Sequence, residues 1–212
     1  MTTSMPPPPP AAPVPSGSPP PSPVHVDLDS PLEIPNLRAI LNPIMAIPHF
    51  VVLWVFSIGL SIVTFIAWFS ILFTGEYPPA MFDFATGVLR YQWRVNSYYM
   101  FMREPYPSFT LTSGPNDPGD DPAKWSIDVP TQPRDKMTVL LRALLVIPAM
   151  VVLFLYGIVA YVMLVIAWFT VLFTGKWSQS SRDYIIRVMR YGYRVLSYYY
   201  LMTDLYPGFA VE

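Results

Sequence analysis

Arginine, aspartate and serine recur along two stretches of the sequence at a spacing that would gather them on one side of a helix. The stripe in residues 79–102 consists of Asp83, Gly87, Arg90, Arg94 and Ser97, and the stripe in 179–202 of Asp183, Arg187, Arg190, Arg194 and Ser197. At about 100° per residue, each set falls within an arc of roughly 80°. Guanidinium groups bind phosphate and carboxylate oxygens well. The candidate contacts for an anionic lipid or another anion are therefore Arg90, Arg94, Arg187, Arg190 and Arg194.

Few other side chains suggest chemistry. The segment NDPGDD at 116–121 gathers carboxylates that could attract Ca²⁺, but its spacing does not match a known calcium loop. The two histidines, His25 and His49, are too far apart to form a zinc motif, and the lack of cysteine excludes thiolate ligands and nucleophiles. The sequence also has no glycine-rich phosphate loop and no serine elbow. We therefore expect no enzyme activity, no catalytic residue, no bound metal and no cofactor.

The composition is typical of a membrane protein. Hydrophobic residues make up 53% of the chain and charged residues 13%, whereas soluble domains carry about 25% charged residues. The net charge of -1 gives no bulk basicity for nucleic-acid binding. Prolines crowd residues 1–23, which predicts a disordered tail, either a solvated spacer or a docking site for a proline-binding partner.

An internal repeat organises the rest of the sequence. AWFSILFTG at 67–75 returns as AWFTVLFTG at 167–175, and the matches continue at the same offset. We interpret this as a tandem duplication, with copy 1 at 24–111, a loop at 112–124 and copy 2 at 125–212. Each copy begins with a strand-like stretch, at 24–28 and 125–129, followed by an apolar lead-in that ends at a proline.

Each copy then contains a long apolar run, at 49–73 and 149–173, without Lys, Arg, Asp or Glu. As a helix, each run covers roughly 37 Å, which is enough to cross a hydrocarbon core of about 30 Å. The fold class is therefore a mainly α integral membrane protein. In each copy a transmembrane helix precedes an amphipathic helix rich in Arg and Tyr. We expect Gly75 and Gly175 to end the apolar helices in the left-handed conformation. The expected interface anchors are Trp68, Trp168, Tyr98 and Tyr198.

The striped helix can occupy one of three environments. It can lie flat in the membrane interface, cross the membrane with its stripe facing a polar cavity, or pack on a partner protein. One crossing per copy puts six basic residues on one side and seven on the other, so the positive-inside rule gives no orientation. If each copy instead returns to its starting side, all thirteen face one compartment. The strand-like pieces near Val24, Phe109, Trp125 and Phe209 would then meet in one sheet at the membrane surface. We expect this second topology, with both ends and the loop at 112–124 on the cytoplasmic side, and keep one crossing per copy as the alternative.

The repeated pattern resembles a known family. IPHFVVLW at 47–54, AWFSILFTGEYP at 67–78, GVLRYQWRVNSYYMFM at 87–102 and YPSF at 106–109 carry the resemblance, and copy 2 repeats most of it. The family is the bacterial membrane-protein family catalogued as domain of unknown function 4389. The resemblance implies membrane residence and no assigned activity. Copy 2 departs from the pattern with Ala149 in place of His49.

These observations predict a non-catalytic, multi-pass protein of the cytoplasmic membrane that interacts with lipid or scaffolds a complex of the cell envelope. Its expected partners are membrane lipids, preferably anionic, together with another membrane protein or a second copy of the chain, and no nucleic acid. The alternative is a small transporter or channel-like module. In that case the arginine stripes of both copies would line a polar path.

Overall fold

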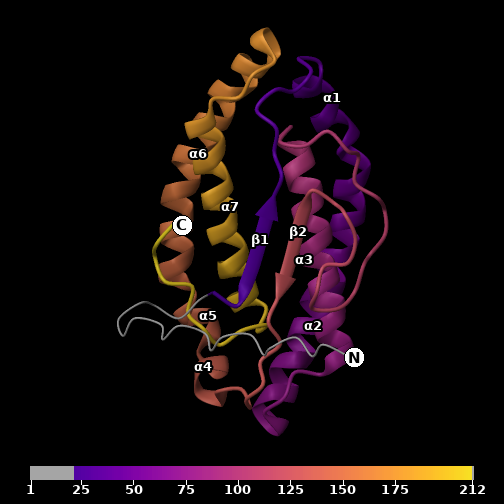
Figure 1. Ribbon diagram of the computed structural model, residues 1–212. Coiled ribbons are helices and arrows are strands. Elements are labelled where there is room, and N and C mark those ends of the chain that lie inside the picture. Colours follow the sequence, from indigo (N-terminus) through magenta and orange to yellow (C-terminus); the bar gives the residue numbers. More distant parts are fainter. Residues whose placement is uncertain (1–21, 212) are drawn as a thin grey trace, which may run out of the picture.

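The computed structural model describes residues 22–211, so the proline-rich tail predicted for residues 1–23 lies almost wholly outside the described part of the chain. The elements follow the same order in each half (Figure 1). In the first half they are β1 (Val24–Leu28), α1 (Arg38–Met45), α2 (Ile47–Thr74) and α3 (Pro79–Tyr99). In the second half they are β2 (Ala123–Ile127), α4 (Lys136–Leu140), α5 (Arg142–Leu145), α6 (Ile147–Thr174) and α7 (Gln179–Tyr199).

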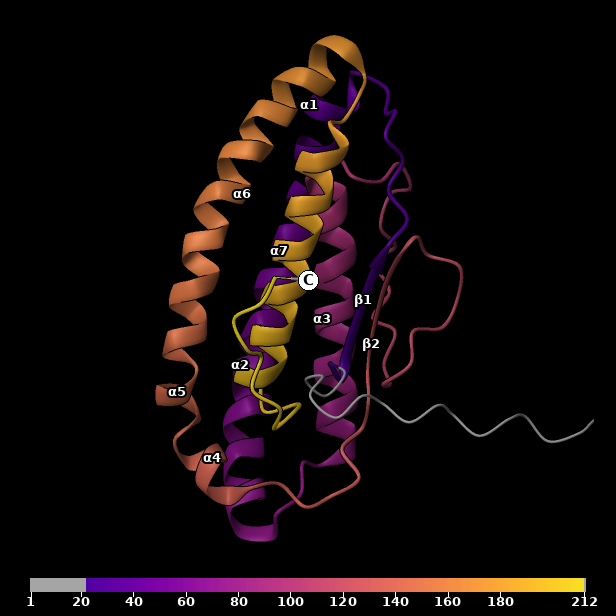
Figure 2. The same cartoon turned by 60° about the vertical axis from the view of Figure 1, so that its left-hand side comes forward.

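The elements form three layers. The apolar helices α2 and α6 form one outer layer, α3 and α7 the middle layer, and β1 and β2 the other outer layer (Figure 2). Each apolar helix packs against the following helix of its own copy, and the strands pack on α3 and α7. α2 and α6 run in opposite directions, as do α3 and α7 (Figure 1). The two copies are thus related by a pseudo-twofold axis that crosses the layers.

The apolar helices carry the residues that the sequence predicted for their ends, a proline at the start and a glycine at the end. Pro48 lies in the first turn of α2, where its missing N–H costs no hydrogen bond. α2 ends at Gly75 with φ 82°, and α6 ends at Gly175 with φ 69°. Both glycines adopt the left-handed conformation in which a side chain would be strained. The striped helices are shorter than predicted and end at Tyr99 and Tyr199.

The sheet differs from the prediction in register and in extent. β1 and β2 are antiparallel, with Val24 opposite Ile127, so β2 begins two residues before the predicted 125–129. Ala123, Trp125 and Ile127 alternate toward the core, which sets this register. The predicted sheet of four pieces is wrong within the described residues, because the segments near Phe109 and Phe209 join no strand. The Phe109 ring stacks on His49 instead, with centroids 4.1 Å apart.

The two copies exchange contacts across the pseudo-twofold axis. The indole N–H of Trp68 donates to the carbonyl of Val139 at 3.1 Å, and that of Trp168 donates to the carbonyl of Ala39 at 2.8 Å. Likewise, the carbonyls of the cap glycines Gly75 and Gly175 each accept a backbone N–H from the lead-in of the other copy, Arg134 and Ile34 respectively, at 2.9 Å. The lead-in of each copy is therefore fixed by the apolar helix of the other.

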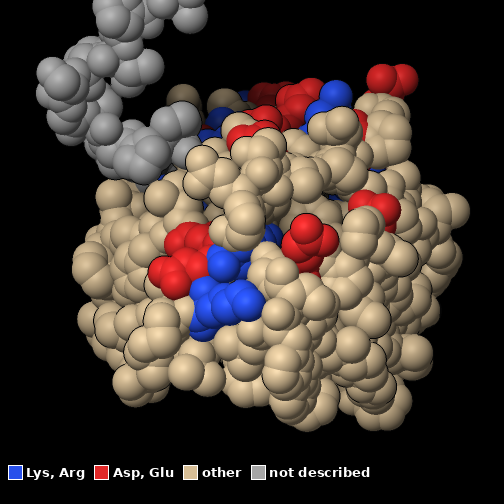
Figure 3. Space-filling view, turned by 90° about the horizontal axis from the view of Figure 1, so that it is seen from below, with Lys and Arg blue, Asp and Glu red and all other residues tan. Residues whose placement is uncertain are grey.

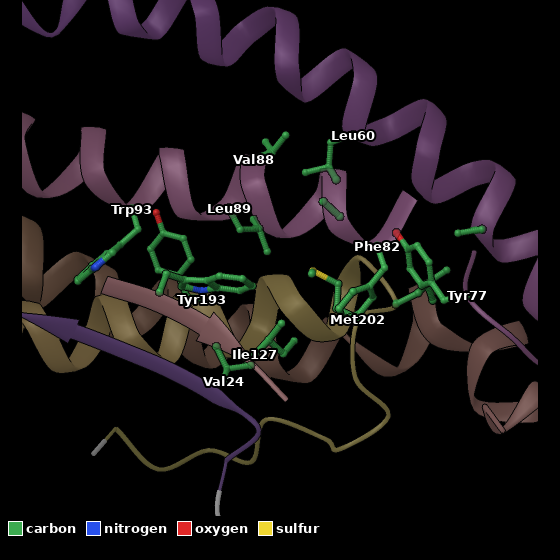
Figure 4. Packing of buried hydrophobic residues seen from close by; sticks show 14 of the residues in the cluster. Val24, Leu60, Tyr77, Phe82, Val88, Leu89, Trp93, Ile127, Tyr193 and Met202 are labelled. Atoms are coloured by element: carbon green, nitrogen blue, oxygen red, sulfur yellow. The ribbon is translucent and has the colours of Figure 1, made fainter. Parts of the chain in front are cut away.

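The buried hydrophobic residues of the described chain form three clusters, and the largest joins the sheet, the middle helices and α2. Trp93 of α3 and Tyr193 of α7 point toward one another, with ring centroids 5.3 Å apart in an edge-on arrangement (Figure 4). Leu60, at the middle of α2, closes the same cluster from the apolar layer. Trp93 also donates its indole N–H to the carbonyl of Asp27 at 3.1 Å, which holds β1 over the middle of α3.

Candidate membrane-facing surface and arginine clusters

The outer layer presents an extended apolar face to the surroundings. Two stretches, Arg38–Thr74 and Arg142–Thr174, contain windows with mean hydropathy 2.5 and 2.7 that are long enough to cross a membrane, and only 11% and 6% of those windows are buried. The core helix of a soluble protein would be buried on at least one broad stripe. The most exposed large side chains on this apolar face are Trp54, Phe65, Phe73, Phe154, Tyr161 and Phe173.

Charged side chains lie away from the apolar face. Figure 3 looks at the end of the molecule formed by α4 and the end of α2. It shows Lys, Arg, Asp and Glu near the centre of this end and toward the side of the sheet, with none along the side of α2 and α6. Serine and threonine do occur on the apolar helices. Their hydroxyls bond carbonyls of the same helix, such as Ser61 to Ser57 at 2.8 Å and Thr170 to Ile166 at 2.9 Å. The apolar face therefore carries no unsatisfied hydroxyl from these residues.

Arg90 is buried inside the protein. Its side chain is 1% exposed and donates to four backbone carbonyls, those of Trp125, Thr112, Gly114 and Asn116, at 2.5–3.0 Å. Burial lowers the pKa of this guanidinium, and Asp117, 3.3 Å away, opposes that shift. Arg90 thus holds the loop before β2 against α3 and is not available to a lipid headgroup in this structure.

Arg94 completes a buried ionic cluster with the acidic segment 116–121. Its guanidinium lies 2.6 Å from Asp117 and 3.6 Å from Asp121, and Arg103 binds Asp121 with both terminal nitrogens, the shorter contact being 2.6 Å. Of the three carboxylates considered for Ca²⁺, those of Asp117 and Asp121 are therefore neutralised by arginines of copy 1. In the described residues, no cluster of His, Cys, Asp and Glu could hold a metal ion.

The arginines of copy 2 are more open. Arg187 is exposed, and Arg190 is 37% exposed with its Nε bound to the carbonyl of Val26 at 2.8 Å. Arg194 donates to the carbonyl of Ala210 at 2.8 Å. Arg190 and Arg194 line a shallow cleft of about 270 Å³ beside β1. The five predicted arginines thus form no single surface. The two arginines of α3 are buried, whereas the three arginines of α7 keep exposed surface.

The predicted interface anchors are partly or wholly inside the protein. Trp68 and Trp168 are half-buried and bond the other copy, whereas Tyr98 and Tyr198 are buried. Tyr98 packs edge-on against Tyr106, with centroids 5.5 Å apart. Trp68 and Trp168 therefore hold the two copies together in this structure.

Sequence reasoning missed a second ionic cluster at the end of the molecule near α4. Arg142 is 3% exposed, binds Asp204 at 2.5 Å and donates to the carbonyl of Thr203 at 2.8 Å, while its Cζ lies 4.0 Å from the Tyr198 ring centre. Arg134 lies 3.5 Å from the same carboxylate. Arg142 interrupts the apolar run MTVLLRALLVIP, and an arginine in such a run requires a partner. The sequence therefore indicates that Arg142 needs a partner, but it does not identify Asp204 as that partner.

Comparison with known proteins gives one result. The model of a family described as a domain of unknown function, DUF4389, matches residues 36–110 and 136–210. Each match begins just before or within the lead-in and ends beside the Tyr-Pro segment that follows the striped helix. No curated protein and no solved structure matches the chain.

Proposed function

The chain belongs to the DUF4389 family in two tandem copies, and from this premise we propose that it is a non-catalytic integral protein of the cytoplasmic membrane that binds anionic lipid and organises or scaffolds its surroundings. The observation that carries the proposal is the exposed apolar face of α2 and α6. The family description names no activity, so the argument rests on the surface itself.

The size of the apolar face supports membrane embedding. Each apolar helix is about 42 Å long and roughly 10 Å wide, so the pair presents roughly 800 Å² even as a flat projection. The largest apolar patch of a typical soluble monomer covers about 300–600 Å². The hydrocarbon core of a bilayer can cover such an apolar face along its whole length. The backbone polar groups of α2 and α6 are already bonded within the helices, which is the condition for contact with lipid.

The open arginines of α7 support the lipid-binding part of the proposal. Arg187, Arg190 and Arg194 lie on the helix next to the apolar layer and retain exposed surface, whereas Arg90 and Arg94 are occupied by their own loop. This narrows the candidate lipid contacts to three. The alternative of a polar path lined by both stripes loses support, since one stripe is closed by backbone carbonyls and carboxylates.

Two measurements test the proposal. We expect the protein to stay in the membrane fraction after an alkaline carbonate wash, and its release would overturn the embedding. We also expect native mass spectrometry to find phosphatidylglycerol retained in preference to phosphatidylcholine, with that preference reduced severalfold in the triple variant R187Q/R190Q/R194Q. The matched control is K124Q/K136Q/K176Q, which also removes three exposed cations, none of them on α7. Equal lipid retention in both variants would contradict the role of the arginines.

A further inference from the structure

We propose that the protein lies in one leaflet of the membrane with α2 and α6 parallel to the bilayer plane. This inference rests on the proposed function, because it specifies how the apolar face meets lipid. The partner surface is a single leaflet, and the polar sheet faces the water on the same side. Although α2 and α6 are each long enough to cross a bilayer, neither does so in this arrangement.

The position of the sheet is the first argument. β1 and β2 lie beside the middle of α3 and α7, not at their ends (Figure 1). Arg90 and Arg190, both near the helix midpoints, bond the carbonyls of Trp125 and Val26 in the strands. Helices that crossed the membrane would therefore carry the sheet to the depth of the bilayer centre.

The exposure of the sheet is the second argument. The side chains of His25, Asp27 and Asp128 are 51%, 76% and 69% exposed, and Lys124 is exposed between them. Charged groups at the bilayer centre face a protein partner or a water-filled cavity, not lipid. In the described chain nothing covers this face. Lying in one leaflet removes the conflict, because every strand side chain then faces water or the core.

The thickness of the layers is the third argument. One leaflet offers about 15 Å of hydrocarbon, half of the roughly 30 Å core, and a single layer of helices is about 10–12 Å thick. The middle layer, packed about 10 Å above it, then lies at the depth of the headgroups. This is where Arg187, Arg190 and Arg194 would meet phosphate. The sheet extends beyond, into water.

The pseudo-twofold symmetry makes the two topologies experimentally distinct. The turn after α2 carries Glu76 and the turn after α6 carries Lys176, and these turns lie at opposite ends of the molecule because α2 and α6 are antiparallel. Both side chains are exposed. Crossing helices would put Glu76 and Lys176 on opposite sides of the bilayer. Helices lying in the plane put both on the same side.

The test uses the double variant E76C/K176C in proteoliposomes, because the natural chain has no cysteine. A membrane-impermeant maleimide is added from outside, and intact mass spectrometry counts the adducts on each molecule. We expect molecules with two adducts or none, whichever way the protein inserts. A population with a single adduct on every molecule would overturn the proposal. Detergent-solubilised protein, which should take two adducts, verifies that both sites react.

A depth measurement gives an independent readout. Spin labels at Val51, Ile62 and Phe73, all exposed along α2, should report nearly equal depth in one leaflet. A depth that is greatest at Ile62 and shallow at both ends would contradict the proposal. Carbonate extraction of the same variants separates this failure from that of the proposed function: a protein that is not embedded is released, whereas a crossing protein is retained and gives single adducts.

Discussion

Replacing Arg90 by Gln tests the buried anchor most directly. The change removes the charge paired with Asp117 and most of the donors that reach four backbone carbonyls. The side chain is 1% exposed, so water cannot take over these bonds without opening the loop. The equivalent arginine of copy 2, Arg190, provides a control with the same residue type at the same position of its helix.

The expected magnitudes differ clearly. Removing one partner of a buried ion pair costs about 3–5 kcal/mol, because the other charge and its acceptors remain buried. Arg190 makes one backbone hydrogen bond, at 2.8 Å, and lies 3.6 Å from Asp27, whose side chain is 76% exposed. One such bond contributes about 1–2 kcal/mol and an exposed pair about 0–1 kcal/mol. From the middle of each range, we therefore expect R90Q to destabilise the fold by about 2 kcal/mol more than R190Q.

The assay follows tryptophan fluorescence during thermal unfolding in detergent, with limited proteolysis of residues 112–122 as a local readout. R90Q should lower the midpoint clearly more than R190Q and should expose the loop to protease under conditions where R190Q stays intact. Arg90→Lys keeps the charge but cannot supply five donors in a plane, so it should fall between wild type and R90Q. Equal midpoints for R90Q and R190Q, with an intact loop in both, would refute the reasoning.

Two further predictions concern the caps and the tyrosines. Gly175→Ala should destabilise the fold more than Gly75→Ala does in the same assay. A Cβ at Gly175 would lie 2.5 Å from the Asn36 side-chain oxygen, whereas the atom nearest to a Cβ at Gly75 is 3.8 Å away. Both substitutions also cost about 1–2 kcal/mol because an alanine must adopt the left-handed conformation. Equal effects would contradict the contact. Burial raises the pKa values of Tyr91 and Tyr191 to about 12, so their contribution to stability should be complete below the unfolded pKa of about 10 and be lost as the pH rises toward 12. The difference in ultraviolet absorbance between wild type and Y91F/Y191F isolates these two of the fourteen tyrosines. It should show no ionisation near pH 10 in the folded protein, and a difference that appears near pH 10 before unfolding would contradict this.

Local signals in the sequence predicted the elements well. The two apolar runs, the prolines that start α2 and α6 and the glycines that end them were each recognised from residues adjacent in the chain. The helical spacing of the arginines was also correct, since Arg90 and Arg94 do lie on one side of α3 and bind the same carboxylate. The extent of the sheet was wrong, because an alternating pattern does not reveal whether a partner strand or an aromatic ring such as His49 will fill the space beside it.

The sequence by itself determined the apolar helices, the duplication and the family, because composition, periodicity and repeats are properties of neighbouring residues. Only the tertiary structure decided which arginines are free. Arg90 and Arg190 occupy the same position in equivalent helices, yet one is enclosed by a loop 22–27 residues further along the chain and the other is not. The tertiary structure also set the sheet beside the middle of the helices. The physical reason is the same in both cases: burial of a charge depends on the groups that folding brings around it, and helical spacing specifies only the side from which they must come.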